Sequence, residues 1–250
     1  MLRMRNITKT FNSGTVDERV ALDHMDLTLQ DGDFVTVIGG NGAGKSTMQN
    51  AICGTWQPDE GSIELDGVNV SGMPEYKRAR YLGRVYQDPM MGTSAGMEIE
   101  ENLALAVRRG KRHTLRLGIR RSEREDYRRR LKELGLGLED RLTTKVGTLS
   151  GGQRQALTLL MATLQRPKLL LLDEHTAALD PQTAARVMDL ITHNMRDAIR
   201  YGNRLLMLHN GRIVLDISGE EKARLTVADL MDMFRKVSGR EYDNDRTLLA

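Results

Sequence analysis

Residues 35–47 read VTVIGGNGAGKST and set the class of fold that this chain can adopt. The stretch begins as a short apolar run, typical of a buried strand, and continues as a loop with the pattern G-x-x-x-x-G-K-[ST]. The loop consists of Gly39, Gly40, Asn41, Gly42, Ala43, Gly44, Lys45, Ser46 and Thr47. Glycines allow successive backbone N–H groups to point at phosphate oxygens, and the following helix adds the positive end of its dipole. We therefore predict a phosphate-binding loop, in which Lys45 reaches the terminal phosphates and Ser46 offers its hydroxyl to Mg²⁺.

A second apolar run, Leu169 to Leu172, is followed by two carboxylates, Asp173 and Glu174. Four leucines predict a buried strand, and open α/β sheets bind ligands at the carboxyl ends of their strands. Asp173 is expected to hold Mg²⁺ directly or through water, and Glu174 is expected to polarise an attacking water. Together with the phosphate loop (residues 39–47), these carboxylates predict a nucleotide site.

A third motif lies just before a helical pattern, and it is the pentapeptide Leu149, Ser150, Gly151, Gly152, Gln153. Ser150 is expected to cap that helix, while the paired glycines bare backbone N–H groups, which predicts a second anion site. An ordinary loop with an N-cap is the simpler interpretation of Ser-Gly-Gly. In this segment the chain resembles ATP-binding cassette (ABC) ATPases, and the resemblance extends along almost the whole chain.

The resemblance implies the roles of further residues. In cassette ATPases the second anion site meets the γ-phosphate held by another subunit, so two ATP molecules are enclosed in a head-to-tail homodimer. Phe11 matches the aromatic residue that stacks on adenine, although a core phenylalanine is an alternative. Gln87 matches the glutamine that senses Mg²⁺ and contacts the transport partner. Asp180 ends a loop that crosses the dimer interface. The chain is most similar to the ATPase subunits of bacterial importers of the tryptophan/tyrosine type.

The expected fold class is α/β, with a P-loop NTPase core, a RecA-like mixed sheet with N-terminal antiparallel strands, and an inserted helical subdomain. We expect a single cassette domain over residues 1–250. Within it, the catalytic core covers 1–87 and 165–217, the helical subdomain with the pentapeptide covers 88–164, and a helical tail covers 218–250. Residues 88–148 are expected to be mostly helical, with Ser122 and Glu125 forming a capping box at one helix start.

The switch histidine of the family is the feature that fits least well. In the family, this histidine ends a strand, and a full helix separates that strand from the loop that Asp180 ends. In this chain His193 comes only thirteen residues after Asp180. A crossover between parallel strands takes a dozen or more residues, so we infer that about fifteen to twenty residues are absent. Three interpretations stay open: His193 is the switch residue within a helix over 182–201, His209 substitutes at the end of the next strand, or neither works and hydrolysis is impaired.

The charge distribution indicates where the chain acts. The net charge is +3, but residues 108–132 contain twelve Lys or Arg and three acids. Such a block favours an anionic partner, lipid headgroups or nucleic acid, with a solvated helix surface as the alternative. A single cysteine and no apolar leader predict a reducing compartment.

The predicted function is that of a peripheral ATPase subunit on the cytoplasmic face of the cell membrane. It binds Mg-ATP, forms a homodimer across it and drives a separate integral membrane permease, with an extracytoplasmic solute-binding protein in the same system. A small solute such as an amino acid is the expected cargo. Two alternatives are a soluble cassette ATPase acting on nucleic acid or ribosomes, and a nucleotide-binding regulator with impaired hydrolysis. A nucleic-acid partner is disfavoured, because the chain has one cassette and no coiled-coil insertion.

Overall fold

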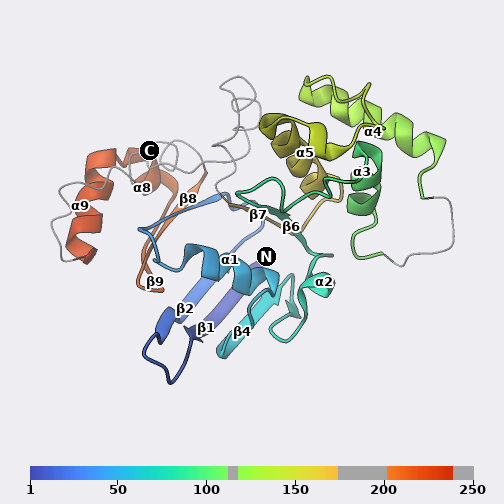
Figure 1. Cartoon of the computed structure of the whole chain (residues 1–250). Helices are drawn as coiled ribbons and strands as arrows, with labels where there is room; N and C mark the ends of the chain where they lie inside the picture. The colour runs from blue at the N-terminus through green and yellow to red at the C-terminus, as the bar shows by residue number, and fades with distance from the viewer. Residues whose placement is uncertain (112–117, 174–201, 239–250) are drawn as a thin grey trace. The chain divides into compact units, whose positions relative to one another are not determined.

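The computed structural model describes residues 1–111, 118–173 and 202–238 of the 250-residue chain (Figure 1). The chain divides into two compact units. Within the described residues, the first unit contains 1–75 and 202–238, and the second contains 76–111 and 118–173.

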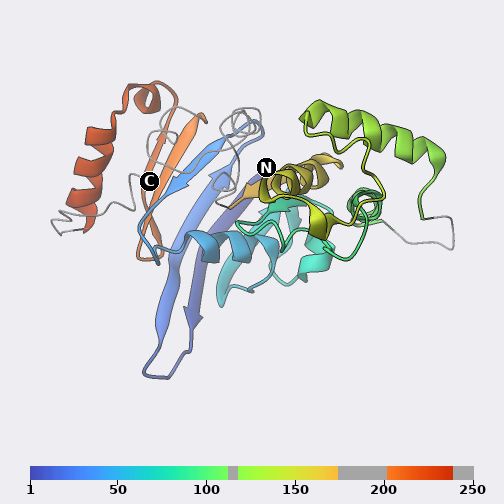
Figure 2. The same cartoon turned by 45° about the horizontal axis from the view of Figure 1, so that its top comes forward.

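The first unit is built from two sheets. Its elements in chain order are β1 (Leu2–Phe11), β2 (Arg19–Leu29), β3 (Val35–Ile38), α1 (Lys45–Cys53), β4 (Glu60–Leu65), β5 (Val68–Asn69), β8 (Arg204–His209), β9 (Arg212–Ser218), α8 (Gly219–Arg224) and α9 (Val227–Ser238). One sheet is antiparallel, with the order β2-β1-β4-β5, and α1 lies across it in both views (Figures 1 and 2). The other has the order β3-β8-β9 and is mixed, because β3 and β8 are parallel while β8 and β9 are antiparallel.

Tight turns follow from residues that tolerate positive φ. Asp66 (φ 52°) and Gly67 (φ 80°) connect β4 to β5, and Asn210 (φ 49°) and Gly211 (φ 76°) connect β8 to β9. Two consecutive positive φ values define the hairpin turn whose twist matches that of paired strands. The Asp-Gly and Asn-Gly pairs therefore suit the turns that they form.

The second unit combines a short parallel sheet with helices. Its elements are α2 (Glu75–Arg78, whose first residue belongs to the first unit), β6 (Leu82–Val85), α3 (Ile99–Val107), α4 (Arg121–Leu134), a 3₁₀ turn (Val146–Thr148), α5 (Gly151–Thr163) and β7 (Leu169–Leu172). Strands β6 and β7 are parallel, with Val85 opposite Leu172. The apolar faces of α3, α4 and α5 form a core with the segment between α4 and α5. Its fully buried members include Leu103, Leu131 and Leu157.

Two local expectations for the second unit are wrong. Outside 112–117, the only helical segments within 88–148 are α3, α4 and the 3₁₀ turn. Helix α4 also begins two residues earlier than a cap at Ser122 requires. The Glu123 carboxylate accepts the N–H of Arg120 at 2.7 Å and pairs with Arg108 at 2.9 Å, so the helix start is fixed by Glu123 instead of Glu125. Within the described ranges, no helix is long and apolar enough to cross a membrane.

Candidate functional site

The phosphate loop joins β3 to α1 and takes a conformation that depends on its glycines. Gly39, Gly42 and Gly44 have φ values of 152°, 76° and 106°, a region that residues with a side chain rarely adopt. A Cβ on Gly39 would overlap the carbonyl oxygen of Leu208 on the parallel strand β8. The loop therefore curls tightly against β8, as the sequence pattern requires.

The first turn of α1 directly follows the phosphate loop. Its N-cap residue is Gly44, and no side chain caps the helix. The first N–H groups of a helix have no partner within that helix, so they attract an anion together with the helix dipole. Lys45 Nζ donates to the carbonyl oxygens of Gly39 and Gly40, at 3.1 Å for Gly40. The ammonium group thus lies over the loop that surrounds the predicted phosphate position, and Ser46 on the same turn is exposed.

Two neighbouring segments hold the phosphate loop in place. The N–H of Gly211, in the β8–β9 turn, donates to the Ala43 carbonyl at 3.0 Å, and the N–H of Asp23 donates to the Gly211 carbonyl at 3.0 Å. A Cβ on Gly44 or on Gly211 would approach the Ala21 carbonyl of β2 to 2.7 or 2.8 Å. Strand β2, the hairpin turn and the loop therefore pack backbone against backbone.

Phe11 ends β1 and pairs with Arg19 across the β1–β2 ladder. Its ring is half-buried and packs edge-on with Trp56, with centroids 5.2 Å apart, and the Lys9 ammonium lies 5.7 Å from the ring centroid. Phe11 is thus in the same unit as the phosphate loop and lies at its surface. Adenine stacking on Phe11 stays a prediction.

Asp173 and Gln87 are brought to one edge of the β6–β7 sheet in the second unit. Asp173 follows β7 directly, and its N–H donates to the Val85 carbonyl at 3.1 Å. Gln87 comes two residues after the end of β6 and is exposed. The carboxyl ends of parallel strands are where open α/β sheets place ligand-binding groups, so this edge suits the two predicted Mg²⁺-site residues.

The Ser-Gly-Gly segment begins α5 as expected. Ser150 Oγ accepts the N–H of Gln153, and Gln153 Oε1 accepts the N–H of Ser150, both at 3.2 Å. This reciprocal capping box satisfies two donors and leaves Gly151 and Gly152 at the exposed start of the helix.

Two buried or half-buried polar side chains that hold functional loops were missed by the sequence analysis. Arg154 Nη2 donates to the carbonyls of Val146, Gly147 and Leu149, at 3.0 to 3.3 Å, and so fixes the segment before Ser150. Asn102 is 1% exposed and bonds to the backbone of Ser94 and Glu98. It anchors the loop that follows Gln87. An asparagine within an apolar helix pattern is the one sequence signal that could have identified such an anchor.

Four predicted residues remain to be placed. Glu174, Asp180 and His193 lie outside the described residues. His209 is the last residue of β8, the strand that runs parallel to β3 with Met207 opposite Ile38. It therefore lies at the carboxyl end of the strand beside the phosphate loop and also directly before the hairpin turn. The choice between His193 and His209 as switch residue stays open.

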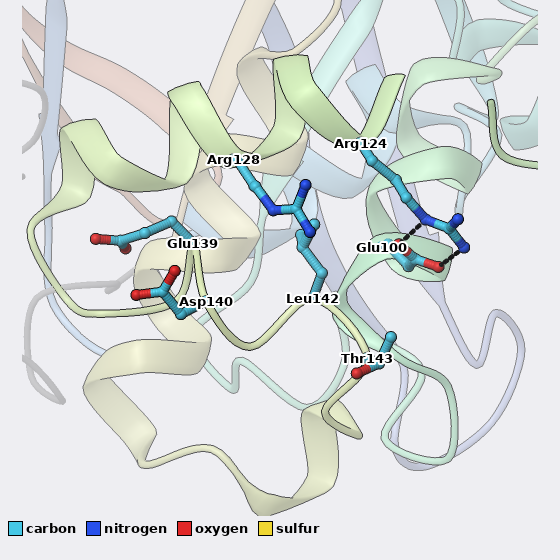
Figure 3. A pocket seen from close by; sticks show the side chains of 7 residues that line it. All are labelled: Glu100, Arg124, Arg128, Glu139, Asp140, Leu142 and Thr143. Atoms are coloured by element: carbon cyan, nitrogen blue, oxygen red, sulfur yellow. Dashed lines mark hydrogen bonds and ion pairs between the residues drawn. The ribbon is translucent and has the colours of Figure 1, made fainter. Parts of the chain in front are cut away.

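Part of the basic block (residues 108–132) pairs with carboxylates of its own unit. Glu100, on α3, accepts two hydrogen bonds from Arg124 of α4, at 2.6 and 2.7 Å, and these bonds lower the pKa of Glu100 against the effect of burial (Figure 3). Arg129 and Arg130 both pair with Asp126. The Glu100–Arg124 pair lines a pocket of about 320 Å³ with Arg128, Glu139, Asp140, Leu142 and Thr143 (Figure 3). No residue of the predicted nucleotide site lines this pocket, and its ion pair joins α3 to α4.

These features define a P-loop ATP-binding fold, and the donor sets fit the ligands. The phosphate loop has backbone N–H groups and an ammonium, which suit phosphate. The Ser46 hydroxyl in the first unit, and the Gln87 amide and Asp173 carboxylate in the second, are oxygen donors of the kind that Mg²⁺ prefers, and their role as Mg²⁺ ligands stays a prediction. The chain belongs to the ABC transporter family, whose model matches residues 22–177. Members of this family hydrolyse ATP coupled to transport.

Individual relatives agree with this assignment. The chain is 40% identical to a tyrosine transport ATP-binding protein of Clostridioides difficile, covering 94% of this chain and 98% of the relative. It is 30% identical to a phosphonates import ATP-binding protein of a Ruegeria species, covering 96% and 97%. A solved dimeric, post-hydrolysis ATP-binding cassette bound to ADP and Pi superposes with a TM-score of 0.75 at 27% identity, covering 87% and 98%. The predicted family and fold class are confirmed.

Proposed function

We propose that this chain is the ATP-binding subunit of an importer of a small solute, an amino acid. The observation that carries the proposal is the phosphate loop, in which three left-handed glycines precede a helix without a side-chain cap. Similarity to the tyrosine transport protein over nearly the full length of both chains supports an aromatic amino acid as cargo.

The proposed catalytic residues divide between the two units. The phosphate loop binds the phosphates of ATP, with Lys45 at the terminal ones, and Phe11 stacks on adenine. Ser46, Gln87 and Asp173 hold Mg²⁺, which would neutralise phosphate charge. Glu174 accepts a proton from the attacking water, and a histidine, His193 or His209, assists at the γ-phosphate.

The start of α5 supports a head-to-tail homodimer. A Cβ on Gly151 would meet nothing within 4 Å, and its φ lies outside the left-handed region. Neither backbone strain nor packing against the described residues therefore requires glycine there. Close approach by a ligand held on a second copy would require it, and a solved relative is described as dimeric. We propose that Ser150, Gly151, Gly152 and Gln153, with Asp180 nearby in the dimer, contact the ATP of the partner subunit.

The membrane partner is proposed to bind the helical subdomain (88–164), which the catalytic core (1–87 and 165–217) and the C-terminal tail (218–250) flank in sequence. Met90 and Met91 follow Gln87 and are 46% and 69% exposed, an uncommon exposure for large apolar side chains. We propose that this segment contacts an integral membrane permease at the cytoplasmic face of the membrane, and that an extracytoplasmic solute-binding protein completes the system.

The decisive experiment uses Glu174→Gln, which keeps the shape of the side chain but removes the proposed base. With Mg-ATP, we expect this variant to elute as a dimer in size-exclusion chromatography with light scattering, while Mg-ADP leaves it monomeric. Hydrolysis should fall by about 100-fold or more, since general bases contribute about 10²–10⁴.

Glu220→Gln is the matched control, because Glu220 is an exposed carboxylate on α8 whose one ion pair in the described part of the chain is with Arg224, one turn away. It should behave as wild type. A Glu174→Gln variant that stays monomeric with ATP would contradict the proposed cycle, and turnover stimulated by nucleic acid would favour a soluble cassette ATPase instead.

A further inference from the structure

Arg19 is a basic residue beside the phosphate loop that the predicted site does not include. It begins β2, is exposed, and its Nη2 donates to the carbonyl oxygen of Gly42 at 2.8 Å. A Cβ on Gly42 would overlap the guanidinium group, with Cζ only 3.3 Å away. The glycine at position 42 is therefore needed for the close approach of Arg19 as well as for its φ of 76°.

The position of Arg19 relative to the loop is fixed by the backbone. Two residues further along β2, the Ala21 carbonyl packs against Gly44 and against Gly211, and Gly211 donates to Ala43. In the ladder between β1 and β2, Arg19 lies opposite Phe11. Arg19 thus lies between the phosphate loop and the residue proposed to stack on adenine, all within one unit.

Among the described residues, most of the hydrogen-bonding capacity of Arg19 is unused. A guanidinium has five N–H donors, and one of them is used by the Gly42 carbonyl. Within residues 1–111, 118–173 and 202–238, no carboxylate pairs with Arg19, whereas Arg212, the first residue of β9, pairs with Asp23 at 2.7 Å. A positively charged fork held against a phosphate-binding loop is suited to phosphate oxygens, because guanidinium and phosphate form bidentate, charge-assisted hydrogen bonds.

We propose that Arg19 is a further phosphate-binding residue of the nucleotide site. It holds the phosphate loop through Gly42 and donates its remaining N–H groups to the phosphate chain of the nucleotide. This inference rests on the proposed ATP-binding function and adds a residue from β2 to the loop and its lysine.

The test is a titration of the full-length chain with two ligands, ATP and inorganic triphosphate, by calorimetry in the presence of Mg²⁺. Arg19→Gln should raise the Kd of both ligands by about 10-fold, because each loses the same charge-assisted contact. Arg19→Lys keeps the charge but not the fork, so its Kd should lie between those of wild type and Arg19→Gln. Raising the salt concentration should reduce the difference between wild type and Arg19→Gln.

Arg5→Gln is the matched control, since Arg5 is also an exposed arginine on the same sheet, in β1 opposite Ser62 of β4. Its Kd values should equal those of wild type. A Kd change for ATP but not for triphosphate would overturn the proposal in favour of a base or ribose contact. Unchanged binding of both ligands to Arg19→Gln would overturn it too. Failure of the wild type to bind ATP would instead contradict the proposed function itself.

Discussion

Two helices of this chain begin at glycine-rich segments, α1 after Gly44 and α5 after Ser150, and their first turns differ in what already occupies the backbone donors. Helix α1 has no side-chain cap, and the glycines before it are held by contacts with β2 and β8. Helix α5 carries a complete capping box, and a Cβ on Gly151 would meet nothing within 4 Å among the described residues. The start of α1 is therefore shaped by contacts within its own unit and is open toward a ligand. The start of α5 is stabilised by its own capping box, and contacts with the described residues do not require its glycine.

This difference indicates two kinds of anion site. The phosphate loop is preorganised, because its glycines are fixed by backbone contacts before any ligand binds. The α5 start keeps only the N–H groups of its two glycines for a ligand, so it suits a contact that forms last, when a second subunit arrives. The order in which ATP meets the two sites thus follows from their local hydrogen bonding.

The largest effect is expected from replacing one glycine by alanine in each of the two segments, in separate variants. Gly39→Ala places a Cβ onto the Leu208 carbonyl at a φ of 152°, so the free energy of unfolding should fall by about 2–4 kcal/mol. Gly151→Ala should leave that free energy unchanged or raise it by about 0.5 kcal/mol, since alanine is favoured in a helix. It should, however, abolish ATP-dependent dimerisation. Urea unfolding and light scattering measure the two outcomes.

Each half of this comparison can be contradicted separately. A Gly39→Ala variant as stable as wild type would show that the loop can move away from β8. A Gly151→Ala variant that forms dimers with ATP would show that nothing approaches the α5 start closely.

The next effect separates nucleotide binding from dimerisation. Lys45→Ala should weaken binding of ATP to the monomer by about 10- to 100-fold, because a hydrogen bond from a charged group contributes about 1.5–3 kcal/mol. Calorimetric titration gives the Kd. Lys132→Ala, which removes an exposed lysine from α4, is the control and should bind ATP as wild type does. Equal affinities for wild type and Lys45→Ala would mean that the ammonium stays on the loop carbonyls and does not reach phosphate.

The sequence predicts those parts of the site that local backbone chemistry determines. The phosphate loop follows from the spacing of glycines and Lys45, and the start of α5 follows from Ser150 and Gln153, whose partners are three residues apart. The strand that ends before Asp173 is predicted for the same reason, since a run of four leucines is a local signal. Gln87 was identified only through the resemblance to the family.

Contacts between distant segments were not predictable in this way. Arg19 reaches Gly42 and Arg108 reaches Glu123, and nothing in the local pattern specifies which of 37 Lys and Arg finds which partner. The same limit explains the error at the start of α4. Ser122 is a better intrinsic N-cap than Arg120, but the pairing of Glu123 with Arg108 of α3 determines where the helix begins.

The smallest effect tests whether Ser150 acts only as a cap. Ser150→Ala removes the acceptor for the Gln153 N–H, so the free energy of unfolding should fall by about 1 kcal/mol. Ser150→Asp restores an acceptor of good capping ability and adds a negative charge that the helix dipole favours, so its stability should return to that of wild type.

ATP-dependent dimerisation of the two variants should not follow the order of their stabilities. If the α5 start receives the γ-phosphate of a partner subunit, the carboxylate of Ser150→Asp repels it, and this well-folded variant should dimerise less than the destabilised Ser150→Ala. Light scattering at several ATP concentrations shows which of the two variants dimerises more. Should dimerisation instead follow stability, with Ser150→Asp equal to wild type, the first turn of α5 would be a structural helix start, and the second anion site would have to lie elsewhere on the chain.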